Sequence, residues 1–145
     1  MPTDSATRTV EIAAPLPTVL DTIRDLESQT VWVPEILEAE VLEEWEDSGL
    51  PATARFKASA TVGTDSYVLT YEQRDDGMDW SMVKGRLQTG QEGSYQLVAS
   101  GPDSTSVTFT LTIHHNLPLP GFVRKKVITG LVEGTVTGLK SHLEG

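Results

Sequence analysis

Two adjacent histidines, His114 and His115, are the residues whose type most suggests chemistry. They end a segment with strand-like alternation, in which neighbouring side chains point to opposite faces. Both rings therefore cannot easily hold one ion, and the chain has neither a cysteine nor an HExxH motif. We expect no metal site. Because histidine titrates near neutral pH, either ring could act as a lone general base, with His114 as the named candidate. A surface position is the simpler interpretation.

Tyr67 and Tyr71 are the other candidates for proton transfer, although no partner residue marks them as catalytic. They share one face of an alternating segment, and Glu72 falls on the other face. A buried phenol near a substrate carbonyl would suit a cyclase or dehydratase. The sequence shows no nucleophile–base pair, paired carboxylates, phosphate-binding glycine loop or dinucleotide motif. We therefore expect no cofactor.

The charge balance is acidic, with 21 Asp and Glu against 11 Lys and Arg and a formal net charge of −10. Such a chain repels phosphate backbones, so we expect no nucleic-acid partner. The only basic run is Arg124-Lys125-Lys126. A solvated helix turn is the favoured interpretation of this run. Contact with an anionic headgroup is the alternative, which leaves transient membrane contact open.

A length of 145 residues suits one domain, which we place at residues 6–145 after a polar, frayed segment at residues 1–5. No stretch approaches the ~20 apolar residues that span a bilayer, so no integral membrane association is expected. No signal peptide is evident, and the absence of cysteine fits a reducing compartment. These features favour a cytoplasmic protein. They leave the oligomeric state open.

Hydrophobic periodicity predicts about seven strands, two short helices after the first strand, and one long helix at the end. The short helices are expected from Leu16 to Leu26 and over 31–37. The long helix is expected over 122–143, with Val123, Val127, Ile128, Leu131 and Leu139 on its apolar face. The strands are expected over residues 7–13, 39–46, 52–62, 66–73, 78–83, 92–99 and 105–114, with turns at Gly63-Thr64 and Asp76-Gly77.

A curved antiparallel sheet gripping one long helix would leave a hollow, because one helix cannot fill the concave side of seven strands. Gly130, Gly134 and Gly138 lie four residues apart on the helix. They either leave room for a ligand or allow close contact between helix and sheet. The expected ligand-binding residues are Trp32, Phe56, Ala58, Tyr67, Leu69, Tyr71, Trp80, Met82, Tyr95, Phe109, Leu111, Val127, Leu131 and Gly134.

Several local motifs resemble the START-like (SRPBCC) superfamily with its helix-grip α+β fold. The matching segments are Ile12-Ala13-Ala14-Pro15, Trp32-Val33-Pro34, Gly93-Ser94-Tyr95, and Leu117 to Phe122. The chain is most similar to bacterial members of the polyketide cyclase/dehydrase and lipid-transport type, relatives of coenzyme Q-binding and birch-pollen allergen proteins. The resemblance implies a hydrophobic ligand tunnel between sheet and long helix, without implying a shared reaction.

Three hypotheses for the function follow, in order of preference. The first is binding or transport of a lipid, isoprenoid or polyketide-like molecule in the cavity, without catalysis. The second is a polyketide cyclase or dehydratase that uses Tyr67, Tyr71 or His114 in the same cavity. The third is a protein-interaction module with a collapsed cavity, for which a dense core without a void would be the sign.

Overall fold

The computed structural model describes residues 3–60 and 63–145. Seven strands form one sheet in the order β1-β7-β6-β5-β4-β3-β2, in which neighbouring strands run antiparallel. The elements, in chain order, are β1 (Thr3–Ile12), α1 (Leu16–Arg24), the 3-10 turn η1 (Leu26–Ser28), α2 (Gln29–Trp32), β2 (Ile36–Glu44), β3 (Pro51–Ala60), β4 (Gly63–Arg74), β5 (Gly77–Gly85), β6 (Gln88–Gly101), β7 (Ser104–His115) and α3 (Gly121–Glu144).

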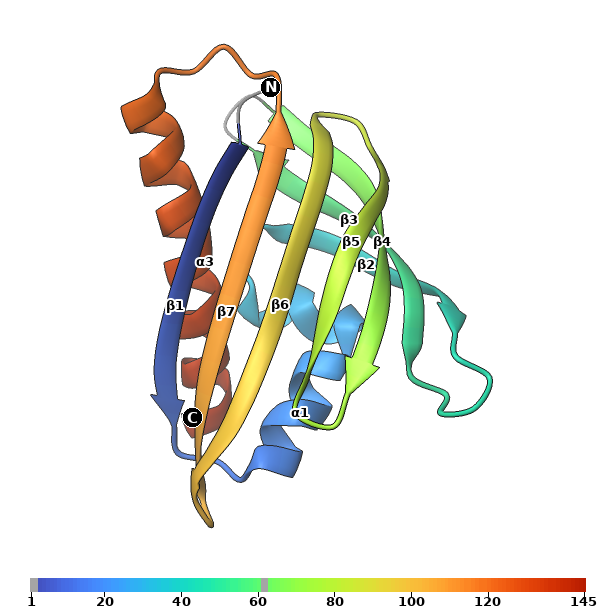
Figure 1. The fold of residues 1–145 in the computed structure, drawn as a ribbon, viewed down its shortest axis with the longest axis vertical. Coiled ribbons are helices and arrows are strands. Elements are labelled where there is room, and N and C mark those ends of the chain that lie inside the picture. Colours follow the sequence, from blue (N-terminus) through green and yellow to red (C-terminus); the bar gives the residue numbers. More distant parts are fainter. Residues whose placement is uncertain (1–2, 61–62) are drawn as a thin grey trace.

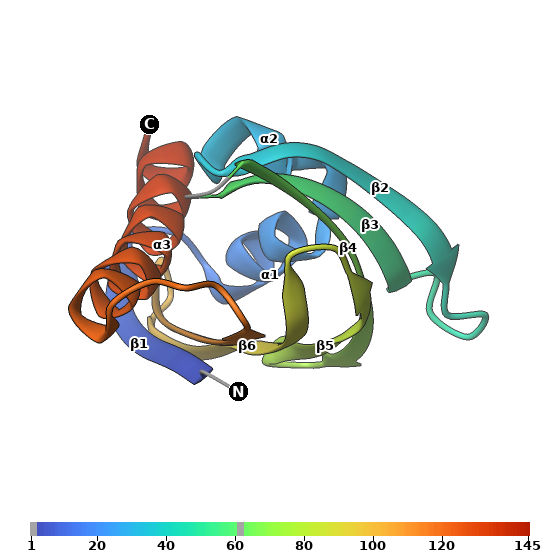
Figure 2. The ribbon, with the colours of Figure 1, turned by 90° about the horizontal axis from the view of Figure 1, so that it is seen from above.

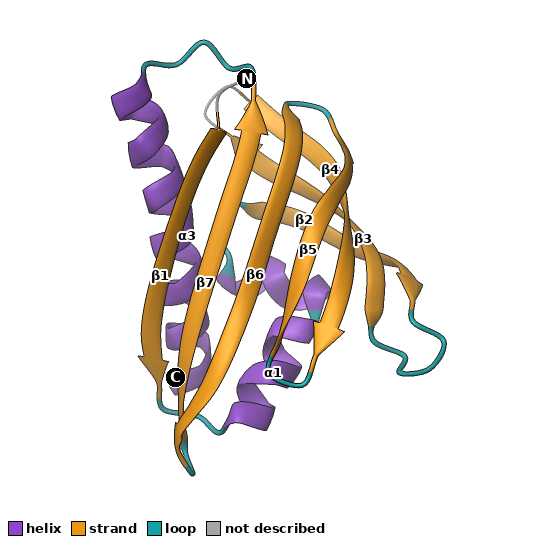
Figure 3. Ribbon diagram, viewed as in Figure 1, coloured by secondary structure: helices purple, strands orange, loops and turns teal. Residues whose placement is uncertain are grey.

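The sheet is strongly curved, and α3 lies along its open side (Figure 1). Seen from above, the strands turn from β1 round to β2, and α3 occupies the gap between these two edge strands (Figure 2). The short helix α1 sits at one end of the concave side (Figure 3). The β5–β6 and β7–α3 connections lie at the other end (Figure 1). The predicted helix-grip α+β architecture is therefore confirmed.

Strand β1 begins at Thr3, so residues 3–5 are paired with β7 rather than frayed as expected. The polar sequence is explained by a hydroxyl ladder between these strands. Ser5, Thr7 and Thr9 hydrogen-bond to Thr112, Thr110 and Thr108 at 2.9, 3.2 and 2.8 Å. Cross-strand hydroxyl pairs of this kind stabilise a sheet face that stays in contact with water. Residues 1–2 of the expected frayed segment lie outside the described residues.

The second short helix also differs from the prediction. The helical turns occupy Leu26–Ser28 and Gln29–Trp32, and β2 already begins at Ile36. The predicted helix over 31–37 was wrong because Pro34 disfavours helical backbone at the preceding Val33, which is extended. The predicted turn residues Gly63 and Thr64 are the first residues of β4 instead, and Val62 of the predicted strand lies outside the described residues.

The packed core lies at the α1 end of the molecule. There the buried side chains of α1, Val19 and Ile23, belong to one hydrophobic cluster with Val107 of β7 and Val136 of α3. The buried face of α3 is made of Ile128, Val132, Thr135, Val136 and Leu139. Ile128 and Leu139 of the predicted face are buried, but Val127 is exposed, and Val132 and Val136 are buried in addition. The difference arises because the first turns of α3 border a cavity rather than this core.

Candidate ligand cavity

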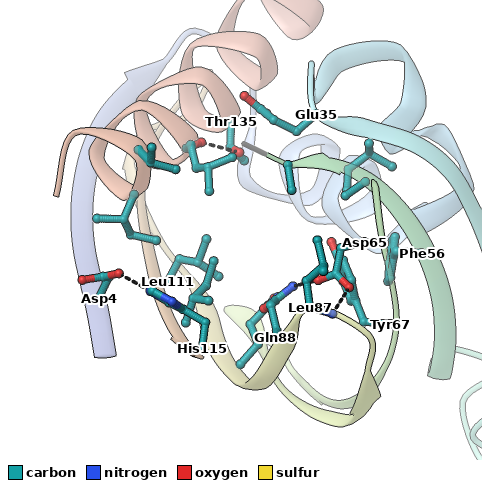
Figure 4. Close-up of a pocket in the computed structure, with 18 of the residues that line it drawn as sticks. Asp4, Glu35, Phe56, Asp65, Tyr67, Leu87, Gln88, Leu111, His115 and Thr135 are labelled. Carbon is teal, nitrogen blue, oxygen red and sulfur yellow. Dashed lines mark hydrogen bonds and ion pairs between the residues drawn. The ribbon is translucent and has the colours of Figure 1, made fainter. Parts of the chain in front are cut away.

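A cavity of about 590 Å³ lies between α3 and the concave face of the sheet. Its volume falls within the roughly 300–1,000 Å³ typical of small-molecule sites. Figure 4 shows side chains from α3, the strands and the connecting loops surrounding an empty centre. The dense, void-free core that would mark a collapsed interaction module is therefore not what the chain forms.

Most of the predicted ligand-binding residues line this cavity. They come from β3, β4, β5, β6, β7 and α3, and the alternation of each strand brings their side chains to the concave face. That they contact a ligand stays a prediction. The residues concerned are Phe56, Ala58, Tyr67, Leu69, Tyr71, Trp80, Tyr95, Phe109, Leu111, Val127 and Leu131.

Three predicted residues lie outside the lining. Trp32 is buried, and its backbone oxygen packs against Gly138 of α3. Met82 follows the inward alternation of β5 but lies beside a register shift between β4 and β5, and its sulfur packs close to Gly85. Gly134 faces Pro34 and Glu35 instead of the open space.

An aromatic cluster forms the floor of the cavity. Trp80 is central, with ring centroids 5.8 Å from Tyr71, 5.4 Å from Tyr95 and 5.9 Å from Phe109. Gly93 pairs directly with Trp80 across β5 and β6, and a Cβ atom at Gly93 would overlap the indole ring. The glycine therefore allows the indole to lie flat over the neighbouring strand, which presents a broad apolar surface to the cavity.

No hydrogen bond joins the hydroxyl of Tyr67, Tyr71 or Tyr95 to another of the described residues. Burial raises the pKa of Tyr67, and the negative charges of Asp65 and Glu35 raise it further. Burial is also the main cause of the raised pKa of Tyr71 and Tyr95. All three phenols therefore keep their protons at neutral pH. They offer hydrogen-bond donors to a bound molecule, and the proton-transfer role of Tyr67 and Tyr71 stays a prediction.

A buried polar relay that we did not predict runs along one wall of the cavity. Trp80 Nε1 donates to Gln91 Oε1 at 3.0 Å, Gln91 Nε2 donates to Gln88 Oε1 at 2.8 Å, and Gln88 Nε2 donates to the Asp65 carboxylate at 2.8 Å. The Leu87 amide also donates to Asp65, at 2.8 Å. The relay holds the indole and the β5–β6 connection in place. Asp65 and Gln91 could have been found from the sequence, because each lies on the inward face of its strand.

A second polar cluster, at the opposite end from α1, corrects the histidine prediction. His115 lines the cavity, whereas His114 lies outside it and contacts Thr3 and Glu92 at 2.9 and 2.8 Å. His115 Nε2 lies 2.6 Å from Asp4 Oδ2, and its Nδ1 accepts the Leu117 amide at 3.1 Å. His114 was the wrong choice because the alternation from Leu111 places the odd-numbered residues inside.

Both ring nitrogens of His115 are thus occupied. Because Nδ1 accepts a backbone N–H, the proton of the neutral ring sits on Nε2 and is donated to Asp4. Asp4 Oδ1 lies 3.4 Å from Arg124 Nε of α3, so the cluster joins β1, β7 and α3. This arrangement holds the β7–α3 connection in place and leaves the imidazole no free nitrogen for a substrate.

The three regularly spaced glycines of α3 have three different surroundings. A Cβ atom at Gly138 would overlap the backbone oxygen of Trp32, so this glycine serves close packing. Gly130 lines the cavity, and nothing lies within 4 Å of where its Cβ would be. At Gly134 a Cβ would make ordinary contact, 3.7 Å from Glu35 Oε1. The close-packing explanation therefore applies at Gly138, whereas room for a ligand beside Gly130 stays a prediction.

The profile of the family described as polyketide cyclase / dehydrase and lipid transport matches residues 3–144. The chain belongs to this family. It is thereby placed in the START (SRPBCC) superfamily, as the resemblance of its motifs suggested. A search of the curated proteins finds no match to the chain.

Solved structures of this superfamily share the fold. A START superfamily protein from Mycobacterium smegmatis is 26% identical, with a TM-score of 0.89 and 97% of each chain covered. The Zhui aromatase/cyclase from Streptomyces sp. R1128 is 13% identical, with a TM-score of 0.80 and 98% of this chain and 94% of that chain covered. A STAR-related lipid transfer protein from Xanthomonas axonopodis is 18% identical, with a TM-score of 0.72 and 97% and 86% covered.

Two further observations bear on cofactors and membranes. In residues 3–60 and 63–145, no group of three or more His, Cys, Asp and Glu side chains could hold a metal ion. Within the same residues, no helix is long and apolar enough to cross a membrane.

Proposed function

We propose that the protein binds and carries an apolar small molecule, such as a lipid, an isoprenoid or a polyketide, in the cavity between α3 and the sheet. The observation that carries the proposal is the cavity itself, about 590 Å³ and lined chiefly by apolar and aromatic side chains. Burial of apolar ligand surface would drive binding at roughly 25 cal/mol per Å², before the costs of association. The family to which the chain belongs supports the same conclusion.

The unpartnered tyrosine hydroxyls support a ligand that also carries oxygen. A phenol hydroxyl that faces the cavity without a protein partner is free to donate a hydrogen bond to a ligand carbonyl or ether. All three tyrosines line the cavity, and the rings of Tyr71 and Tyr95 both contact Trp80. We therefore expect the bound molecule to place an oxygen atom over the aromatic floor.

Binding without a reaction is favoured over cyclisation. A cyclase needs a group that can exchange a proton with the substrate at working pH. The three cavity tyrosines stay protonated, and both nitrogens of His115 are already occupied. These arrangements suit groups that orient a molecule rather than groups that transform it.

The proposal is tested by filling the cavity from Ala58. Ala58 is buried on the inward face of β3 and lines the cavity, so an Ala58→Phe ring would enter it, whereas Thr129→Phe places the same ring at an exposed position outside the lining. Binding of the apolar dye N-phenyl-1-naphthylamine is measured by fluorescence. We expect one dye per wild-type chain, at least tenfold weaker binding by Ala58→Phe, and unchanged binding by Thr129→Phe.

Native mass spectrometry of the gently purified protein, followed by organic extraction, would then identify a co-purifying ligand. A wild-type protein that carries no ligand and binds no dye would overturn the proposal. So would equal dye affinity in the wild type and Ala58→Phe.

A further inference from the structure

Glu35 places an unpaired carboxyl group on the cavity wall. It lies between α2 and β2, and Figure 4 shows its side chain directed toward α3 near Thr135. Its Oε2 atom is buried and has no hydrogen-bond partner among the described residues. A buried polar atom without a partner is rare in folded proteins, so this one requires an explanation.

The position of Glu35 is fixed by its surroundings. Its backbone oxygen accepts the Ser59 amide of β3 at 2.8 Å, and the Ile36 amide donates to Val33 at 3.2 Å. Across the gap, Oε1 lies 3.7 Å from where a Cβ atom of Gly134 would be. The carboxyl group therefore lies between the sheet and α3, opposite Gly134.

The other carboxyl groups of the described lining are compensated, and Glu35 is the exception. Asp4 contacts His115 at 2.6 Å and Arg124 at 3.4 Å. Asp65 accepts hydrogen bonds from Leu87 and Gln88, both at 2.8 Å. Glu35 has neither an ion-pair partner nor a donor within the described residues. A ligand could supply the missing hydrogen bond to the Glu35 carboxylate, as Leu87 and Gln88 supply hydrogen bonds to Asp65.

We propose that Glu35 accepts a hydrogen bond from the polar group of the cavity ligand, and that this group is a hydroxyl or an amine on an apolar body. The inference rests on the proposed binding function and adds the chemical class of the head group. A carboxylate ligand is disfavoured, because Glu35 would repel it and could not be paired by it. Tyr67 lies in the same negative field, since Asp65 and Glu35 both raise its pKa.

The test compares three probes with equal chains and different head groups: decylamine, 1-decanol and decanoate. Each displaces N-phenyl-1-naphthylamine from the wild type, Glu35→Gln and Glu35→Met. We expect the wild type to bind decylamine and decanol at least tenfold more tightly than decanoate. Glu35→Gln should lose about tenfold for decylamine by removing the charge, and Glu35→Met should lose affinity for decanol as well.

Glu38→Gln is the matched control, because Glu38 is an exposed residue of β2 that pairs with Lys57 at 3.5 Å. Its affinities should equal those of the wild type. The melting temperature of the ligand-free protein provides a second measurement. Glu35→Gln should melt at or above the wild-type temperature, since it removes an uncompensated carboxyl group, whereas a structural role for Glu35 would lower the temperature.

The outcomes separate this inference from the proposed function. If the dye binds and Glu35→Gln leaves all three probe affinities unchanged, the head-group assignment is wrong and the cavity remains a binding site. The assignment is also wrong if decanoate is the preferred probe. If the dye itself fails to bind the wild type, the binding function fails and the assignment fails with it.

Discussion

The two halves of α3 differ in what they face, although they belong to one continuous helix. In the C-terminal half, Val136 and Leu139 are completely buried against the core at the α1 end. In the N-terminal half, Phe122 is 79% exposed and Val127 is 37% exposed, and Gly130 borders the cavity. One half therefore contributes chiefly to stability, and the other half forms a wall of the candidate site.

The two ends of α3 also differ in the polar contacts that hold them to the rest of the protein. Near the C-terminus, Lys140 Nζ donates to the Glu11 backbone oxygen at 2.6 Å, and Glu144 accepts the Ala13 amide at 2.8 Å. Near the N-terminus, Arg124 Nε is 3.4 Å from Asp4. A helix held firmly at one end can border an open cavity at the other, because packing at the first end maintains the fold.

The largest expected effect concerns the packed half. Leu139→Ala removes a completely buried side chain and should destabilise the protein by about 2–5 kcal/mol, as large-to-small core substitutions do. Leu131→Ala is the matched control, since Leu131 is half-buried and lines the cavity. Denaturant unfolding measures both. Equal losses for the two leucines would contradict the division of α3 into a core half and a cavity half.

Gly138→Ala should have the next largest effect. The new Cβ atom would overlap the Trp32 backbone oxygen, so α3 and the end of α2 must move apart. Overpacking of this kind costs typically about 1–3 kcal/mol, which exceeds the gain in helix propensity from alanine. Thermal unfolding by circular dichroism would show the loss. A melting temperature unchanged or raised in this variant would mean that the helix does not approach Trp32 this closely.

Much of the fold was predictable because its signals are local. The alternation of apolar residues in β3, β4 and β7 is enough to identify the inward faces of these strands, and therefore most of the cavity lining. The same alternation extends to Asp65, which was missed because a polar residue was not expected on an inward face, and to His115, which was considered but placed behind His114. Extending the apolar alternation of β4 and β7 by one more inward position would have placed both residues in the lining.

Other features depend on contacts that no local pattern records. The hydroxyl ladder makes a strand of residues 3–5, whose composition indicates fraying, and it needs the threonines of β7 from the far end of the sequence. Glu35 lies outside the strands, so alternation gives no indication that its carboxyl group faces the cavity. The different roles of Gly130 and Gly138 depend on what stands opposite each residue in the folded chain.

The smallest predicted effect is also the most direct contrast between the two halves. Gly130→Ala adds a methyl group where nothing lies within 4 Å, so no packing opposes the gain in helix propensity. The free energy of unfolding should rise by up to about 1 kcal/mol. The identical substitution at Gly138 should lower the free energy of unfolding. Thermal melts of the two variants would show whether the two effects have opposite signs. If Gly130→Ala also lowers the melting temperature, the surroundings of Gly130 are more crowded in solution than the structure indicates.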